Sequence, residues 1–162
     1  MAEDTVGFIG VGRMGGRLAQ RLIKAGYDLV IFDTNQDAAQ TFVQQGAQLL
    51  SSPAAVASTC EIVITCLPTP SVVESVALGP NGIVEGKRVK VFIDMSTTGA
   101  TYAKRIARKL AEKNITAVDA PVSGGLAGAE RGTLAVMVSC SDEVLSRIRP
   151  VLEVFGKIFL IG

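Results

Sequence analysis

Histidine is absent from the 162-residue sequence, and this absence removes more chemistry than any other feature of its composition. A Ser-His-Asp or Cys-His mechanism needs an imidazole, so both are excluded, as is a metal site built on histidine. The only cysteines are Cys60, Cys66 and Cys140, and no two of them form a Cys-x-x-Cys pair. This number and spacing argue against a disulfide framework or a zinc site. We therefore expect no metal and a reducing, cytoplasmic setting.

The sequence also lacks an excess of charge of either sign. Sixteen Lys and Arg residues against fifteen Asp and Glu residues give a net charge of +1, so neither nucleic acid nor an anionic membrane is an expected partner. No apolar run approaches the roughly 20 residues of a membrane-spanning helix. The start of the chain, Met-Ala-Glu-Asp-Thr, is acidic and polar, unlike a signal peptide. With 48% apolar residues, the chain is expected to form one domain over residues 1–162.

Strand and helix patterns alternate along the whole chain. Apolar runs predict strands near residues 6–10, 29–33, 62–67, 89–95, 115–119, 134–140 and 157–161. Helical spacing predicts a helix that ends near Gly26, a short helix that opens at Pro53, and further helices over about 36–45, 71–78, 100–112, 126–131 and 142–154. This alternation predicts an α/β fold, a doubly wound and mostly parallel Rossmann-type sheet in a single domain.

The most informative stretch follows the first predicted strand, where a Gly-x-Gly-x-x-Gly pattern leads into a helix. In this setting Gly10 allows a tight turn, Gly12 lets the backbone approach a pyrophosphate, and Gly15 lets the helix pack close to the strand. The helix start offers free N–H groups to the phosphates. A turn without a ligand is the alternative. We expect cofactor contacts here from Gly10, Val11, Gly12, Arg13, Met14 and Gly15.

Asp33 ends the second predicted strand, about twenty residues after the glycine turn. A carboxylate at this place accepts both hydroxyls of an adenosine ribose and repels a 2′-phosphate, and residues 34–37 contain no arginine. The pattern therefore favours NAD over NADP, with Asp33 and Thr34 as contacts. The alternative is that Asp33 caps the next helix, although Asn35 is equally suited to that.

Two further loops follow predicted strands. Leu67 and Pro68 begin a loop stiffened by two prolines. This loop either contacts the cofactor near its nicotinamide side or only connects the strand to the next helix. Thr97 and Thr98 follow the strand near 89–95. We expect Thr97 to contact the cofactor and Thr98 to cap the helix over 100–112.

The stretch Asp-Ala-Pro-Val-Ser-Gly-Gly at 119–125 comes before a short predicted helix. Successive backbone N–H groups of Ser123, Gly124 and Gly125 would form an anion pocket suited to a carboxylate, unless the stretch is only a turn.

At these residues the chain resembles the β-hydroxyacid dehydrogenases, the family of 3-hydroxyisobutyrate dehydrogenase and relatives of 6-phosphogluconate dehydrogenase. The segments that carry the resemblance are 7–15, 67–68, 94–97, 119–125, Gly128 and 132–134. It implies oxidation of a small β-hydroxyacid, or the reverse, by hydride transfer to NAD, with the substrate carboxylate on Ser123, Gly124 and Gly125.

The resemblance also implies a general acid/base lysine in a Gly-x-Gly-x-x-x-Lys-x-x-x-Asn helix, followed by an all-helical domain that builds a homo-oligomer. That pattern does not occur in the sequence, and we expect it beyond Gly162, so no catalytic residue is assigned here. Lys157 lacks the surrounding pattern. The leading hypothesis is an NAD-binding domain that is inactive by itself. The alternatives are a non-catalytic nucleotide-binding or oligomerisation module, and an imine reductase or sugar-phosphate dehydrogenase on the same scaffold.

Overall fold

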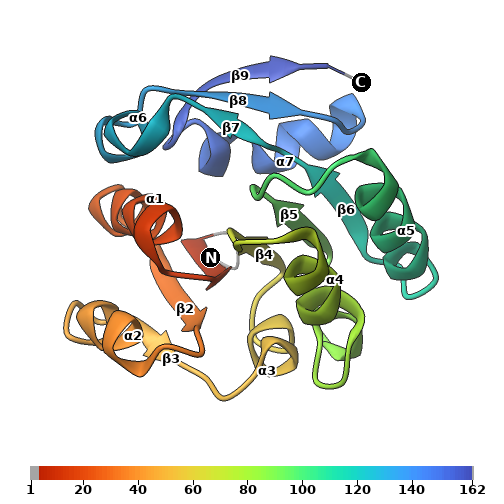
Figure 1. Cartoon of the computed structure of the whole chain (residues 1–162), viewed down its shortest axis with the longest axis horizontal. Coiled ribbons are helices and arrows are strands. Elements are labelled where there is room, and N and C mark those ends of the chain that lie inside the picture. Colours follow the sequence, from red (N-terminus) through yellow and green to blue (C-terminus); the bar gives the residue numbers. More distant parts are fainter. Residues whose placement is uncertain (1–3, 162) are drawn as a thin grey trace.

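The computed structural model describes residues 4–161 and contains a six-stranded parallel sheet (Figure 1). Its strands are β1 (Thr5–Ile9), β2 (Asp28–Phe32), β3 (Gln48–Leu49), β4 (Ile62–Thr65), β5 (Val91–Asp94) and β6 (Thr116–Asp119). Their spatial order is β3-β2-β1-β4-β5-β6, so the order reverses between β1 and β4. This is the doubly wound Rossmann arrangement, and the predicted fold class is confirmed.

Helices cover both faces of this sheet. α1 (Arg13–Lys24) and α2 (Gln36–Val43) pack on one face, and α3 (Pro53–Ala57), α4 (Pro70–Leu78) and α5 (Ala100–Ala111) lie on the other, with a 3₁₀ helix, η2 (Ile83–Glu85). Successive strand residues such as Phe8 and Ile9 point to opposite faces, and both are buried. The central strands β1, β2, β4 and β5 are therefore mainly apolar along their length, because helices cover both faces of the sheet.

The last third of the chain forms a second, smaller sheet of β7 (Val122–Ser123), β8 (Leu134–Val138) and β9 (Gly156–Leu160). β7 pairs with β8 in antiparallel fashion, and β8 pairs with β9 in parallel. α7 (Asp142–Leu152) lies between the two sheets, and its Ile148 and Leu152 are buried in the same cluster as Phe8 (Figure 1). The alternation of elements predicted β8 and β9 but neither β7 nor the separation of the two sheets.

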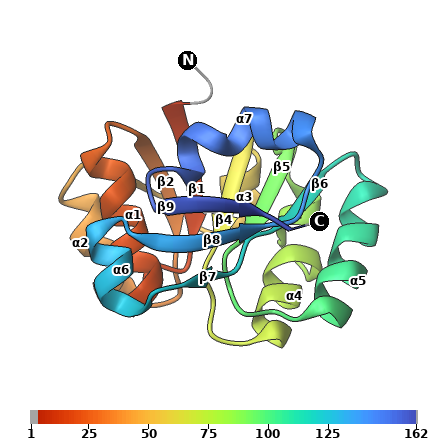
Figure 2. The same cartoon turned by 90° about the horizontal axis from the view of Figure 1, so that it is seen from above.

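α6 (Gly125–Arg131) lies beside α1 in both views (Figures 1 and 2). This contact brings two helices together that lie about 100 residues apart in the sequence. No helix within residues 4–161 has the length and apolar character needed to cross a bilayer. Residues 1–3 of the acidic start, and Gly162, beyond which the lysine helix is expected, lie outside the described residues.

Candidate cofactor cleft and substrate loop

A cleft of about 530 Å³ opens at the carboxyl ends of β1, β2 and β4. In a doubly wound sheet this edge, beside the reversal of strand order, is where dinucleotides bind. Residues predicted from three separate segments line it, namely Gly10, Gly12, Arg13, Met14, Gly15, Asp33, Thr34, Leu67 and Pro68. Sequence reasoning missed its apolar wall, which is formed by Phe32 and by Val72 and Val76 of α4.

The three glycines of the turn have different surroundings. Gly10 has a φ of +98°, and a Cβ there would lie 2.3 Å from the Cys66 carbonyl oxygen. A Cβ on Gly15 would lie 1.8 Å from the Gly10 carbonyl oxygen, so α1 packs against the turn only because Gly15 has no side chain. Gly12 has a φ of −75°, and a Cβ on it would meet no atom within 4 Å. Nothing in the described chain fills the space above Gly12.

Asp33 has a structural role that the sequence did not reveal. Its Oδ2 accepts the Val11 N–H at 2.7 Å, and its Oδ1 accepts the Asn35 N–H at 2.8 Å. The side chain of Asn35, not that of Asp33, caps α2, accepting the Ala38 N–H at 3.1 Å. Asp33 thus joins the end of β2 to the glycine turn. Val11, which was also predicted as a cofactor contact, is buried and does not line the cleft. Its N–H is bonded to Asp33, which does line the cleft.

The loops after β4 and β5 are joined through Ser96, whose Oγ accepts the Leu67 N–H at 2.8 Å. The expectation that Thr98 caps α5 is wrong: Gly99 is the N-cap residue, and the Thr98 hydroxyl donates to Asp94 Oδ2 instead. Thr97 does not line the cleft described above. It is exposed between two buried residues, Ser96 and Thr98.

The predicted substrate loop, Ser123 to Gly125, is exposed at the start of α6. Gly124 and Gly125 have φ values of +137° and +69°, conformations that favour glycine. The first turn of α6 leaves backbone N–H groups without intrahelical partners. α6, which follows the loop, packs against α1, and near its other end Glu130 forms an exposed ion pair with Arg17 of α1 (Nε to Oε2, 4.0 Å). An exposed arrangement of N–H groups thus lies at the start of a helix that packs on α1.

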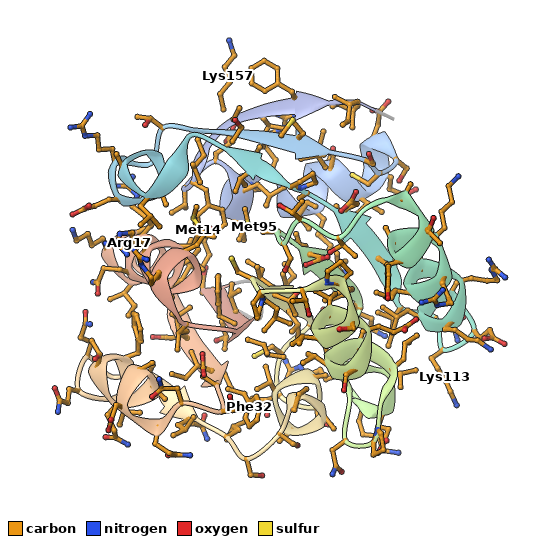
Figure 3. All side chains as sticks on the ribbon, viewed as in Figure 1. Met14, Arg17, Phe32, Met95, Lys113 and Lys157 are labelled. Carbon is orange, nitrogen blue, oxygen red and sulfur yellow. The ribbon has the colours of Figure 1, made fainter. Side chains whose placement is uncertain are left out.

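The ionisable groups limit the chemistry available in the cleft. Burial, together with the nearby charge of Asp94, raises the pKa of the Cys66 thiol to about 12, so Cys66 is no thiolate nucleophile near neutral pH. All seven lysines are exposed, and none of them lines this cleft. Figure 3 shows Lys113 and Lys157 pointing away from the molecule into solvent.

A second cavity, of about 300 Å³, lies between α5 and the ends of β5 and β6. Asp94, Asp119, Lys104 and Ser139 are among its lining residues. Asp94 and Asp119 are paired across the two strands. Burial and the charge of Asp94 raise the pKa of Asp119 to about 6.

Comparison with known proteins supplies the family. A family model described as the NAD binding domain of 6-phosphogluconate dehydrogenase matches residues 5–162. The 2-(hydroxymethyl)glutarate dehydrogenase of Eubacterium barkeri is 42% identical over 153 residues, which make up 94% of this chain and 51% of that protein.

Two solved structures superpose closely. The Mycobacterium tuberculosis 3-hydroxyisobutyrate dehydrogenase with L-serine has a TM-score of 0.89 at 34% identity, over 96% of this chain and 53% of that chain. Psf3 in complex with NADP+ and 2-OPP has a TM-score of 0.90 at 27% identity, over 97% of this chain and 56% of that chain. The chain therefore spans about half the length of the relatives that it matches.

Proposed function

Because the chain belongs to the family of the NAD-binding domain of 6-phosphogluconate dehydrogenase, we propose that it holds NAD for a dehydrogenase of small β-hydroxyacids. The open space above Gly12 is the observation that carries the cofactor part of this proposal. Gly10 and Gly15 are glycines because their own neighbours leave no room, whereas no described atom excludes a Cβ at Gly12. A pyrophosphate lying against the backbone is a reason for glycine there.

In this proposal the residues of the cleft would hold a dinucleotide along its length. The turn at Gly10 to Gly15 and the first N–H groups of α1 would hold the pyrophosphate, and Asp33 with Thr34 would hold the adenosine ribose. Leu67 and Pro68, which line the cleft, and Thr97, which is exposed outside its lining, would lie toward the nicotinamide. We propose NAD rather than NADP because Asp33 carries a negative charge where a 2′-phosphate would lie, with no arginine at residues 34–37.

The proposed substrate is a small acid with a hydroxyl group on its β-carbon, similar to 3-hydroxyisobutyrate. Ser123, Gly124 and Gly125 would hold its carboxylate through exposed backbone N–H groups. When bound, NAD+ supplies the hydride acceptor. The residues of this chain bind and orient, and the proton transfer is assigned to the family's lysine, because the seven lysines here are exposed and lie outside the cleft.

Titration calorimetry of the 162-residue chain with NAD+, NADP+ and ADP-ribose tests the cofactor part. We expect weak binding of NAD+ and ADP-ribose and weaker binding of NADP+. In an assay of NADH formation we expect no turnover of 3-hydroxyisobutyrate. Failure to bind NAD+ or ADP-ribose would overturn the cofactor proposal, and NADH formation by this chain would overturn the assignment of the acid/base to a lysine outside it.

A further inference from the structure

Asp94 is a buried carboxylate at the end of β5, with 5% of its surface exposed. Its Oδ1 accepts the Thr65 hydroxyl at 2.9 Å and the Ser96 N–H at 3.0 Å, and its Oδ2 accepts the Thr98 hydroxyl. Among residues 4–161 no lysine or arginine forms an ion pair with it. A carboxylate taken out of water is costly unless hydrogen bonds stabilise it, so these three donors define one fixed position for Asp94.

The three donors come from two neighbouring strand ends. Thr65 is the last residue of β4, and Ser96 and Thr98 follow β5. Ser96 extends the connection, because its Oγ accepts the Leu67 N–H in the loop after β4. The Met95 N–H also donates a hydrogen bond to the Thr65 carbonyl oxygen at 2.9 Å, which joins the same two strand ends. Through Ser96, Asp94 therefore fixes where the loop that begins at Leu67 leaves the sheet.

This network belongs to one half of the cleft. In a doubly wound sheet of this strand order, each half holds one mononucleotide, and β4 to β6 form the second half. Leu67 lines the cleft, and Thr97 is exposed between the two residues that Asp94 holds. In the first half, Asp33 is bonded to Val11 and Asn35 and shares no hydrogen-bond partner with Asp94.

We infer that Asp94 is a positioning residue for the nicotinamide half of the dinucleotide. It acts through Ser96 on Leu67 and through Ser96 and Thr98 on Thr97, and it does not touch the cofactor itself. The inference rests on the proposed function, because it takes NAD to be the occupant of the cleft. A network that only stabilised the fold would affect both halves of the dinucleotide alike, and this difference makes the inference testable.

The test compares binding of NAD+ with binding of ADP-ribose, which lacks the nicotinamide, by titration calorimetry. Thr98→Val and Ser96→Ala each remove one branch of the network while keeping side-chain size nearly unchanged. We expect each to weaken NAD+ binding about tenfold, in keeping with the loss of one buried hydrogen bond, and to change ADP-ribose binding by less than about twofold. Asp94→Asn keeps an acceptor for Thr65 and Ser96, and we expect a smaller loss than in Asp94→Ala.

Ser141→Ala is the matched control. Ser141 caps α7 by accepting the Val144 N–H at 3.3 Å, so this variant also loses one hydroxyl bond, away from the cleft. We expect it to bind both nucleotides as the unaltered chain does. Hydrogen exchange of the Leu67 amide gives a readout without ligand: exchange should quicken in Ser96→Ala and Thr98→Val but not in Ser141→Ala.

The outcomes separate the inference from the proposed function. If the unaltered chain binds neither NAD+ nor ADP-ribose, the proposed function fails and the inference fails with it. If the unaltered chain binds both, and the Ser96 and Thr98 variants lose both equally or lose neither, only the inference is overturned. Selective loss of NAD+ with faster Leu67 exchange supports it, even if Asp94→Ala does not fold.

Discussion

The carboxylate of Asp33 accepts the backbone N–H of Val11 at 2.7 Å, so the end of β2 is tied directly to the glycine turn after β1. The side chain proposed to distinguish NAD from NADP therefore also shapes the turn proposed to hold the pyrophosphate. Its second bond, from the Asn35 N–H, fixes the start of α2 as well. Substitution of Asp33 must be interpreted through both roles.

The first prediction follows from this double role. Asp33→Ala should weaken NAD+ and NADP+ together, because the turn loses its anchor, and should weaken NAD+ further, because the ribose hydroxyls lose their acceptor. Asp33→Asn keeps part of the anchor but removes the charge, so its preference for NAD+ over NADP+ should fall by about tenfold or more. Calorimetry with both cofactors measures this preference. Equal losses for the two cofactors in both variants would mean that Asp33 does not recognise the ribose.

Local patterns predicted these lining residues of the candidate cleft because the relevant signals are local. The glycines from Gly10 to Gly15 lie between a strand and a helix, and Asp33 ends the next strand, so both could be placed at one edge of the sheet. The side chain of Thr98 could not be assigned in this way. It lies where a helix cap is expected, and its true partner, Asp94, is identified only when β4 and β5 lie side by side.

The second sheet was missed for a related reason. β7 has only two residues, Val122 and Ser123, and pairs with β8 in antiparallel fashion. No run of two residues carries a periodic signal, and the pairing depends on where α6 returns the chain. The packing of α6 against α1 was likewise not contained in the sequence pattern.

The second prediction compares how substitutions of Gly12 and of Gly15 affect thermal stability and NAD+ affinity. Gly12→Ala should leave the thermal midpoint within a few degrees of the unaltered chain, because a Cβ there meets no atom, but should weaken NAD+ binding about tenfold or more. Gly15→Ala should lower the midpoint strongly, since its Cβ would overlap the Gly10 carbonyl oxygen. Calorimetric melting and NAD+ titration of the two variants test this contrast, and unchanged NAD+ affinity in Gly12→Ala would contradict it.

The third prediction concerns the pH dependence of stability. Burial, with the charge of Asp94, raises the pKa of Asp119 in the folded chain from 3.8 to about 6. Between about pH 4 and 6 the folded chain holds a proton that the unfolded chain has lost, so this contribution to stability is present at low pH and is lost as pH rises through 6. The amide of Asp119→Asn does not ionise, so this variant should not lose stability in this way as pH rises. Above pH 6 it should be more stable than the unaltered chain by about 1 kcal/mol and by less than about 3 kcal/mol, since solvent screens a half-buried group.

Denaturant unfolding at several pH values measures this difference. Other carboxyl groups titrate over the same range, so the informative quantity is the stability of Asp119→Asn minus that of the unaltered chain. Asp94 and Lys104 line the cavity with Asp119 and are unchanged in both proteins. Asp28→Asn, at an exposed position at the start of β2, is the control. A constant difference from pH 4 to 8 would show that Asp119 does not titrate differently in the fold.

The last prediction concerns the edge of the smaller sheet. Within residues 4–161, β9 pairs only with β8, so one side of its backbone has no strand partner there. Phe159, Leu160 and Ile161 are 43%, 46% and 61% exposed. An unpaired strand edge with exposed apolar side chains beside it favours pairing with another chain. We expect the 162-residue chain to associate with itself as its concentration rises, and sedimentation analysis should detect this.

The double substitution Phe159→Lys with Leu160→Lys should reduce this association, because like charges would then face each other across a β9 contact. Val72→Lys, which alters an exposed apolar residue of the cleft, should not. If Val72→Lys is the variant that abolishes association, the chains meet through the cleft and β9 is not their contact.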